Sequence, residues 1–140
     1  MIAFFHWFGT LHRRVYERNG TLGRRFAWIP CLVLTTTGRK SGQRRDSVLA
    51  YADDPAGRVV VASNGGSDAP PGWLFNVQAH PAVHVQVGNE HYDANARVVT
   101  PADAEYTRLW HLVNSINGHR YDAYQAKTSR PIAMVVLERP

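Results

Sequence analysis

The residues of this chain whose types and spacing most readily indicate ligand binding lie in segment 34–47, whose sequence is LTTTGRKSGQRRDS. Two glycines, Gly38 and Gly42, enclose an Arg-Lys-Ser tripeptide. Glycine lets successive backbone N–H groups converge on one point, and the basic side chains add positive charge. The spacing differs from that of a Walker phosphate-binding loop, and the chain contains no G-x-G-x-x-G sequence. The segment therefore predicts a loop that holds an anion.

A second cluster of small and polar residues, ASNGG, occupies residues 62–66 at the end of a strand predicted from RVVVASN. The strand before it, predicted from SVLAYA, is joined to it by the turn sequence DDPAG at residues 53–57. We expect these two strands to form a hairpin, so that the two clusters flank one cleft. Such a cleft suits a flat ring with a long anionic tail.

Other catalytic chemistries are not indicated by the sequence: we find no catalytic triad, no pair of catalytic carboxylates and no metal cluster. His80 and His84 are four residues apart, but Pro81 interrupts any helix between them, so we expect no metal ligands there. The single cysteine, Cys31, excludes an internal disulfide. Because it begins the apolar run CLVL, we expect a buried and unreactive thiol.

The charge of the chain is unevenly distributed. Its 140 residues fit one domain, its formal net charge is +5, and Glu17 is the only acidic residue before residue 46. This asymmetry indicates an anionic partner, which is a nucleic acid, an anionic membrane surface or an anionic small molecule, unless the basic face is simply solvated. Basic and aromatic residues do not form a platform for single strands, so we expect no nucleic acid. The absence of a signal-peptide pattern and of a run of about 20 apolar residues favours a cytoplasmic location.

Hydrophobic periodicity predicts the elements that position these residues. Residues 1–25 are predicted to form an amphipathic helix with Phe4, Phe8, Leu11 and Val15 on one face. Strand-like segments lie at residues 31–37, 47–52, 58–64, 82–88, 91–100 and 132–138. A short helix is expected at 73–80, and a longer one from Thr100, its cap, and Pro101. About six mainly antiparallel strands predict a small, mixed α+β barrel.

Four sequence blocks occur in one order: LTTTGRKSGQRR, VVVASNGG, the tryptophan of PGWLFNVQAHPAVHVQVG, and YDAYQAKTSRPIAMVVLE. By these blocks, over about residues 30–138, the chain resembles the deazaflavin (coenzyme F420)-dependent nitroreductase and quinone reductase family. The resemblance implies a split β-barrel of the flavin-mononucleotide-binding type over residues 26–140. It also implies an oxidoreductase that transfers a hydride from reduced coenzyme F420 to a quinone, a nitro compound or a similar electrophile.

The resemblance also implies roles for individual residues. The GRKSG loop corresponds to the part of the family site that grips the phosphate and carboxylate tail of the cofactor. The cofactor-binding residues implied by all the blocks are Arg39, Lys40, Ser41, Arg45, Asp46, Ser47, Val48, Leu49, Ala50, Val61, Ala62, Ser63, Asn64, Gly72, Trp73, Leu74, Phe75, Asn76 and Tyr121. The candidate catalytic residues, which could donate a hydrogen bond to the acceptor oxygen, are Ser63, Tyr121 and Tyr124. For the two tyrosines, packing at the rim of the site is the alternative.

Three positions depart from the family pattern. Asn64 stands where several relatives have lysine, and Arg44 replaces a common proline. Gly118 lies near the position of an additional tyrosine in nitro-activating members. This last difference bears more on the reduction of nitro compounds than on the cofactor.

Several alternatives remain open at this point. The same barrel could serve a flavin-mononucleotide-dependent oxidoreductase or a non-catalytic cofactor-binding protein, and the basic N-terminal third permits a nucleic-acid-binding module. Residues 1–18 could contact the inner face of the membrane peripherally, or they could cap the barrel. The sequence leaves the oligomeric state undetermined.

Overall fold

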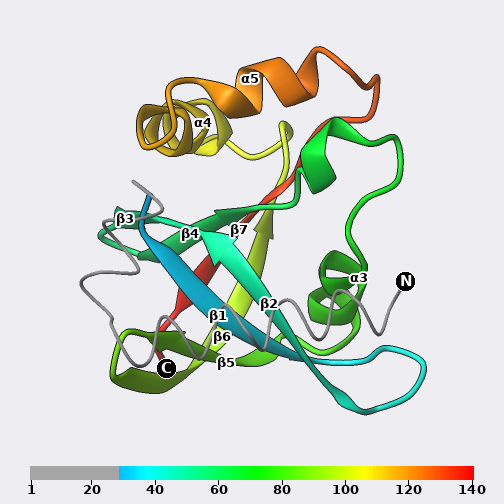
Figure 1. Ribbon diagram of the computed structural model, residues 1–140, viewed down its shortest axis with the longest axis vertical. Helices are drawn as coiled ribbons and strands as arrows, with labels where there is room; N and C mark the ends of the chain where they lie inside the picture. Colours follow the sequence, from blue (N-terminus) through cyan, green and yellow to red (C-terminus); the bar gives the residue numbers. More distant parts are fainter. Residues whose placement is uncertain (1–28) are drawn as a thin grey trace.

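The computed structural model describes residues 29–140, so the helix predicted for residues 1–25 lies outside the described part. Its strands are β1 (Cys31–Thr37), β2 (Arg44–Ala50), β3 (Ala52–Asp54), β4 (Gly57–Val61), β5 (Ala82–Val87), β6 (Glu90–Val99) and β7 (Met134–Glu138) (Figure 1). Its helices are the short 3-10 helix η1 (Asn64–Gly66), α3 (Gly72–Ala79), α4 (Tyr106–Ser115) and α5 (Arg120–Gln125). None of these helices has the length and apolar character needed to cross a bilayer.

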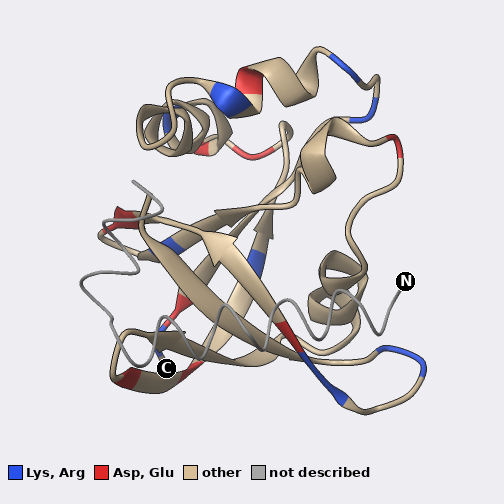
Figure 2. Ribbon diagram, viewed as in Figure 1, with Lys and Arg blue, Asp and Glu red and all other residues tan. Residues whose placement is uncertain are grey.

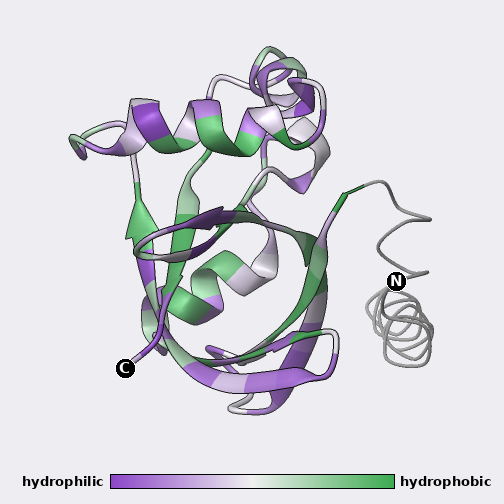
Figure 3. Cartoon of the chain, turned by 90° about the vertical axis from the view of Figure 1, so that its left-hand side faces the viewer, coloured by the Kyte–Doolittle hydropathy of each residue, from purple (hydrophilic) through white to green (hydrophobic). Residues whose placement is uncertain are grey.

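The strands of the described chain form one antiparallel sheet of seven strands in the order β2-β1-β5-β6-β7-β4-β3. The two outermost strands of this order, β2 and β3, are separated in the chain only by Tyr51. The sheet must therefore curl until its two ends approach each other at this residue. In the view of Figure 3 the strands accordingly curve into a ring, with α4 and α5 beyond one side of it.

Strand β7 shows why the sequence near the C-terminus is so apolar. Its residues Met134, Val135, Val136 and Leu137 are all 0 % exposed, because both faces of the strand are covered. Val135 and Leu137 belong to the core inside the barrel, whereas Met134 and Val136 belong to a second core beneath α4 and α5. Successive strand residues point to opposite faces, so one continuous apolar run serves two cores.

Helix α3 contributes to the core inside the barrel. Trp73, Leu74 and Val77 lie on this helix and are buried with residues of β1 and β5 such as Leu34 and Val85. The helix begins directly after Pro71, whose extended backbone makes it the residue before the first helical turn. Burial of Trp73 and Leu74 in its first turn places the beginning of the helix against β1.

The expected hairpin between the second and third predicted strands is only partly correct. The turn at residues 53–57 does join two antiparallel strands, but these are β3 and β4, whereas β2 pairs with β1. The chain changes partners at Tyr51, whose N–H donates to the carbonyl of Pro30 and whose side chain is 3 % exposed. Because β2 and β3 lie at opposite ends of the closed sheet, the chain passes from one end to the other at this residue.

The start of the long helix was also predicted too early. Residues 100–105 form turns, and α4 begins only at Tyr106. The carboxylate of Asp103 accepts hydrogen bonds from the N–H of Thr100 at 2.8 Å and from its hydroxyl at 3.5 Å. The Thr100 side chain therefore does not cap α4, because Thr100 and Asp103 close a separate turn before the helix.

Candidate functional site

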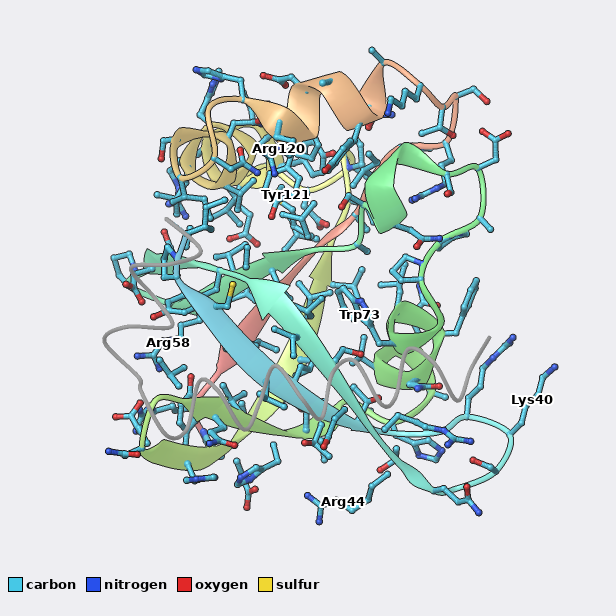
Figure 4. All side chains as sticks on the ribbon, in the orientation of Figure 1. Lys40, Arg44, Arg58, Trp73, Arg120 and Tyr121 are labelled. Atoms are coloured by element: carbon cyan, nitrogen blue, oxygen red, sulfur yellow. The ribbon has the colours of Figure 1, made fainter. Side chains whose placement is uncertain are left out.

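A cavity of about 1030 Å³ lies between the β1–β2 loop, strand β2, the segment after β4, the start of α3, and α5. Figure 4 shows Lys40 on the β1–β2 loop and Tyr121 and Arg120 near α5, well apart, with Trp73 between these two regions. The cavity therefore extends from a basic loop to a pair of tyrosines. It brings together the two clusters at 38–42 and 62–66, even though β2 pairs with β1 and not with β4.

Most of the residues predicted to bind the cofactor line this cavity. They are Arg39, Lys40, Ser41, Arg45, Asp46, Ser47, Val48, Leu49, Ala50, Val61, Ser63, Asn64, Gly72, Trp73, Phe75, Asn76 and Tyr121, and the candidate catalytic Tyr124 lines it too. Ala62 and Leu74 do not line it and are buried in the core inside the barrel. Val61 reaches the cavity and Ala62 does not, because neighbouring residues of an extended chain face opposite sides.

The loop of residues 38–43 has a closed geometry. The N–H of Gly38 donates to the carbonyl of Gln43 at 2.7 Å, and the N–H of Gly42 donates to the carbonyl of Gly38 at 2.9 Å. The hydroxyl oxygen of Ser41 accepts from the N–H of Gln43 at 3.1 Å. A Cβ atom at residue 38 would come within 2.6 Å of the Ser41 hydroxyl oxygen and 3.2 Å of the Gln43 carbonyl oxygen, so a larger residue there would have to displace the Ser41 side chain.

Asn76 attaches this loop to the barrel. Its side-chain oxygen accepts from the N–H of Arg39 at 3.0 Å, and its side-chain nitrogen donates to the hydroxyl of Thr36 at 3.1 Å. The guanidinium group of Arg39 lies over the ring of Phe75, 4.6 Å from the ring centroid. The loop is therefore fixed to α3 by both its backbone and its first basic side chain.

The loop end of the cavity is strongly cationic, as the blue loop between β1 and β2 in Figure 2 shows. Arg39, Lys40 and Arg45 line it and are exposed, whereas the only carboxylate among its described lining residues is Asp46, which accepts from Thr35 at 2.6 Å. Within the described chain the N–H groups of residues 40 and 41 make no hydrogen bond. Free N–H groups beside several cations are suited to binding a phosphate or carboxylate.

Two tyrosines, Tyr121 and Tyr124, line the other end of the cavity. Tyr121 is 7 % exposed, and its ring lies edge-on to that of Tyr124, with the ring centroids 6.2 Å apart. Burial, together with the neighbouring Cys31 and Tyr124 groups, raises the pKa of Tyr121 to about 12, while Arg120 lowers it in part. A tyrosine is protonated at neutral pH in any case, and the raised pKa extends the pH range over which the Tyr121 hydroxyl remains a hydrogen-bond donor.

Seven lining residues were not among the predicted site residues: Ile29, Cys31, Gly38, Gly65, Pro71, Asn117 and Arg120. Gly38 and Gly65 belong to the two recognised clusters, and Arg120 directly precedes the YDAY block, so the sequence did contain a signal for these three. Asn117 accepts a hydrogen bond from the N–H of Arg120 at 3.1 Å. Nothing in the local sequence identifies that contact.

Cys31 differs from its expected position. It is half-buried and lines the cavity, whereas we expected complete burial in the core. It is the first residue of β1, so its side chain lies where the strand has only begun to enter the core. Burial still raises the pKa of its thiol, which favours the less reactive thiol form.

A sequence profile described as F420H(2)-dependent quinone reductase matches residues 7–139 of the chain. The chain belongs to this family. A Mycobacterium tuberculosis protein named F420H(2)-dependent quinone reductase is 44 % identical to it over 131 residues, which are 92 % of this chain and 88 % of that protein. The family assignment is also the one that the four sequence blocks indicated.

Solved structures agree with this assignment. The structure described as F420-H2 Dependent Reductase (FDR-A) has a TM-score of 0.70 and 36 % identity, covering 78 % of this chain and 94 % of that one. A chain described as a domain-swapped dimer has a TM-score of 0.72 and 34 % identity, covering 94 % and 97 %. These neighbours confirm the mixed α+β split barrel, which contains seven strands in the described residues where about six were expected.

Family membership makes the protein an oxidoreductase whose cofactor is reduced coenzyme F420. The lining residues fit this group. A molecule with a flat ring system and an anionic tail needs an elongated cavity with cations and free N–H groups at one end, and the cavity has both. Ser47, Val48, Leu49 and Ala50 of β2, together with Trp73, provide the partly apolar wall that a ring requires.

Proposed function

We propose that this protein reduces quinones with reduced coenzyme F420. The bound cofactor supplies a two-electron hydride donor, so the protein itself must bind, orient and exclude water. The observation that carries the proposal is the single cavity that joins a cationic loop to two tyrosines. Each of these two ends suits one of the two reactants.

The loop end would hold the anionic tail of the cofactor. Arg39, Lys40 and Arg45 supply the charge, and the N–H groups of residues 40 and 41 supply donors without any rearrangement. Charge-assisted hydrogen bonds are about twice as strong as neutral ones, so this end would supply much of the affinity. The Asn76 contact with Arg39 keeps the loop in place before the cofactor arrives.

The tyrosine end would hold the acceptor. A quinone oxygen gains negative charge as it is reduced, and preorganised donors stabilise that charge. The Tyr121 hydroxyl is protonated at neutral pH, as in an ordinary tyrosine, and Tyr124 and Ser63 line the same cavity. We assign to these three hydroxyls the role of donors to the acceptor oxygen.

Quinones are proposed here in preference to nitro compounds. The connection before α5 contributes Asn117 to the cavity wall, and its neighbour Gly118 has no side chain. An additional tyrosine hydroxyl at this connection, of the kind associated with nitro-activating relatives, is therefore missing. The 44 % identical relative is itself named a quinone reductase, which supports the same choice.

We also propose that residues 1–18 contact the membrane surface where lipid-soluble quinones reside. Their sequence combines apolar residues such as Phe4, Phe8 and Leu11 with Arg13, Arg14 and Arg18. Apolar and basic residues of this kind favour binding to anionic headgroups. This segment lies outside the described residues, so the proposal rests on its sequence alone.

The test is a titration of the purified protein with coenzyme F420 and with flavin mononucleotide, followed by turnover with a naphthoquinone and with a nitroimidazole. We expect preferential binding of coenzyme F420 and turnover of the quinone well above that of the nitro compound. Tighter binding of flavin mononucleotide would contradict the cofactor assignment for this cavity. Equal or faster turnover of the nitro compound would contradict the choice of acceptor.

A further inference from the structure

Arg130, in the segment between α5 and β7, makes an unusual set of contacts. Its guanidinium group donates three hydrogen bonds to backbone carbonyls: to Ala62 at 3.2 Å, to Ser63 at 2.8 Å and to Ser67 at 2.8 Å. All three acceptors belong to the segment after β4 that contributes Ser63 to the cavity. Arg130 itself does not line the cavity.

The segment whose carbonyls accept these hydrogen bonds follows β4 and is not part of the sheet. After the N–H of Ala62 donates to Ala133, the chain leaves β4 and enters η1, where Asn64, Gly65 and Gly66 all have positive φ angles of 45°, 65° and 86°. Asparagine and glycine are the residues that adopt left-handed backbone most readily, and the Asn64 side chain also donates to the carbonyl of Ala69 at 2.9 Å. The shape of this turn is therefore largely local, whereas its position relative to α5 depends on contacts with other segments.

Two further contacts join the same segments. The hydroxyl of Thr128 donates to the carboxylate of Asp68 at 2.8 Å. Gly66 packs so closely on α5 that a Cβ atom there would lie 2.7 Å from the carbonyl oxygen of Tyr124. The segment bearing Ser63 is thus docked on the segment bearing Tyr121 and Tyr124, and Arg130 supplies the largest number of the hydrogen bonds.

We infer that Arg130 is a positioning residue, which fixes the Ser63 hydroxyl relative to those of Tyr121 and Tyr124. The planar guanidinium fork can reach three carbonyls in a fixed geometry, which the single ammonium group of lysine cannot reproduce. The inference rests on the proposed function, because it assigns these hydroxyls to one acceptor. A displacement of about 1 Å in such a site can cost up to about a hundredfold in rate.

The test compares Arg130→Met with Arg97→Met. Arg97 is also a multiply bonded arginine, because it pairs with Glu105 and Glu138, but among residues 29–140 neither it nor these two partners line the cavity. Loss of this arginine therefore reports the general cost of removing such a side chain. Arg130→Lys serves as the conservative variant, and it replaces Arg130→Met if that protein does not fold.

The first readout is amide hydrogen exchange in the cofactor-free proteins. The N–H groups of Gly66 and Ser67 donate to Ser63 and Asn64 at 2.9 Å and 3.1 Å, so they report the local conformation. We expect Arg130→Met to accelerate exchange at these two amides by about tenfold or more, with the amides of β4 and β7 unchanged. Arg97→Met should leave the two amides protected.

The second readout is quinone turnover at a temperature at which all variants are folded. We expect kcat to fall by about tenfold or more in Arg130→Met, with partial recovery in Arg130→Lys and no comparable loss in Arg97→Met. Unchanged protection of Gly66 and Ser67, or a loss of kcat no larger than in Arg97→Met, would overturn the inference. If the proposed function is wrong, the parent protein itself will show no quinone turnover. The exchange measurement would still decide whether Arg130 stabilises the segment after β4.

Discussion

The side-chain oxygen of Asn76 accepts a hydrogen bond from the backbone N–H of Arg39 at 3.0 Å, although the two residues are 37 positions apart. The same amide donates to the hydroxyl of Thr36, so one buried side chain joins α3, β1 and the cationic loop. Because its hydrogen bonds are satisfied by the protein, Asn76 defines the position of the loop. We therefore expect its contribution to cofactor binding to be mostly indirect.

Replacing Asn76 with leucine should damage both stability and cofactor binding. The change leaves the N–H of Arg39 and the hydroxyl of Thr36 without their partner, which costs about 1–3 kcal/mol in the free energy of unfolding. Asn76→Asp keeps the acceptor for Arg39 and should retain more of the affinity. Chemical denaturation and cofactor titration would measure the two effects. Parent-like cofactor affinity in the leucine variant would show that the cationic loop keeps its position without the Asn76 hydrogen bond.

Replacing Arg39 or Lys40 with alanine should weaken cofactor binding by about tenfold to a hundredfold. Each change removes a charge-assisted contact worth roughly 1.5–3 kcal/mol. Arg44→Ala is the matched control, because Arg44 lies on the same hairpin and is exposed but does not line the cavity. Equal losses in all three variants would indicate a general electrostatic attraction and no specific tail site.

Replacing Tyr121 or Tyr124 with phenylalanine should lower kcat more than it weakens cofactor binding. The change keeps the ring and removes only the hydroxyl, and loss of one preorganised donor typically costs about a hundredfold or more in rate. Tyr92→Phe is the control, because the Tyr92 hydroxyl accepts from Arg58 and lies away from the cavity. Parent-like kcat in both cavity variants would leave these tyrosines as packing residues.

The raised pKa of Tyr121 also predicts a pH dependence of stability. A tyrosine in the unfolded chain titrates near pH 10, whereas burial moves the pKa of folded Tyr121 to about 12. The protonated form is therefore favoured by folding, and its contribution to stability is complete below about pH 10 and is lost as the pH rises toward about 12. Unfolding free energies of the parent minus those of Tyr121→Phe should decrease over this interval. A constant difference would contradict the raised pKa.

Removing residues 1–18 should separate the two roles considered for the N-terminal segment. If it contacts membranes, the truncated protein should remain folded and bind cofactor, sediment less with anionic vesicles, and reduce long-tailed quinones poorly while reducing short ones normally. Misfolding or aggregation would instead indicate a structural cap. Unchanged vesicle binding and unchanged turnover of long-tailed quinones would exclude the membrane role.

The sequence predicted those parts of the molecule in which local chemistry determines structure. The glycines and basic residues at 38–42 predicted the cationic loop between β1 and β2, and the apolar run of β7 predicted a buried strand. The turn at Gly88 predicted the β5–β6 hairpin, which the structure confirms. Each of these features depends on residues that are adjacent in the chain.

The features that the sequence did not reveal depend on contacts between distant residues. The exchange of partners at Tyr51 follows from closure of the sheet, which no local pattern encodes. The bonds of Asn76 to Arg39 and of Arg130 to Ser63 join segments 37 and 67 positions apart. Such tertiary hydrogen bonds decide how the site is held together, so the sequence predicted most lining residues but not their supports.

The most direct test of the central claim is a single-turnover experiment. Protein saturated with reduced coenzyme F420 is mixed anaerobically with a naphthoquinone, and oxidation of the cofactor is followed by absorbance in the parent, in an Arg39→Ala and Lys40→Ala double variant, and in Tyr121→Phe. We expect rapid oxidation of one cofactor per quinone in the parent. The loop variant should need more cofactor to reach the same rate, and the tyrosine variant should stay slow even at saturation. Oxidation in the parent no faster than without protein would contradict the claim.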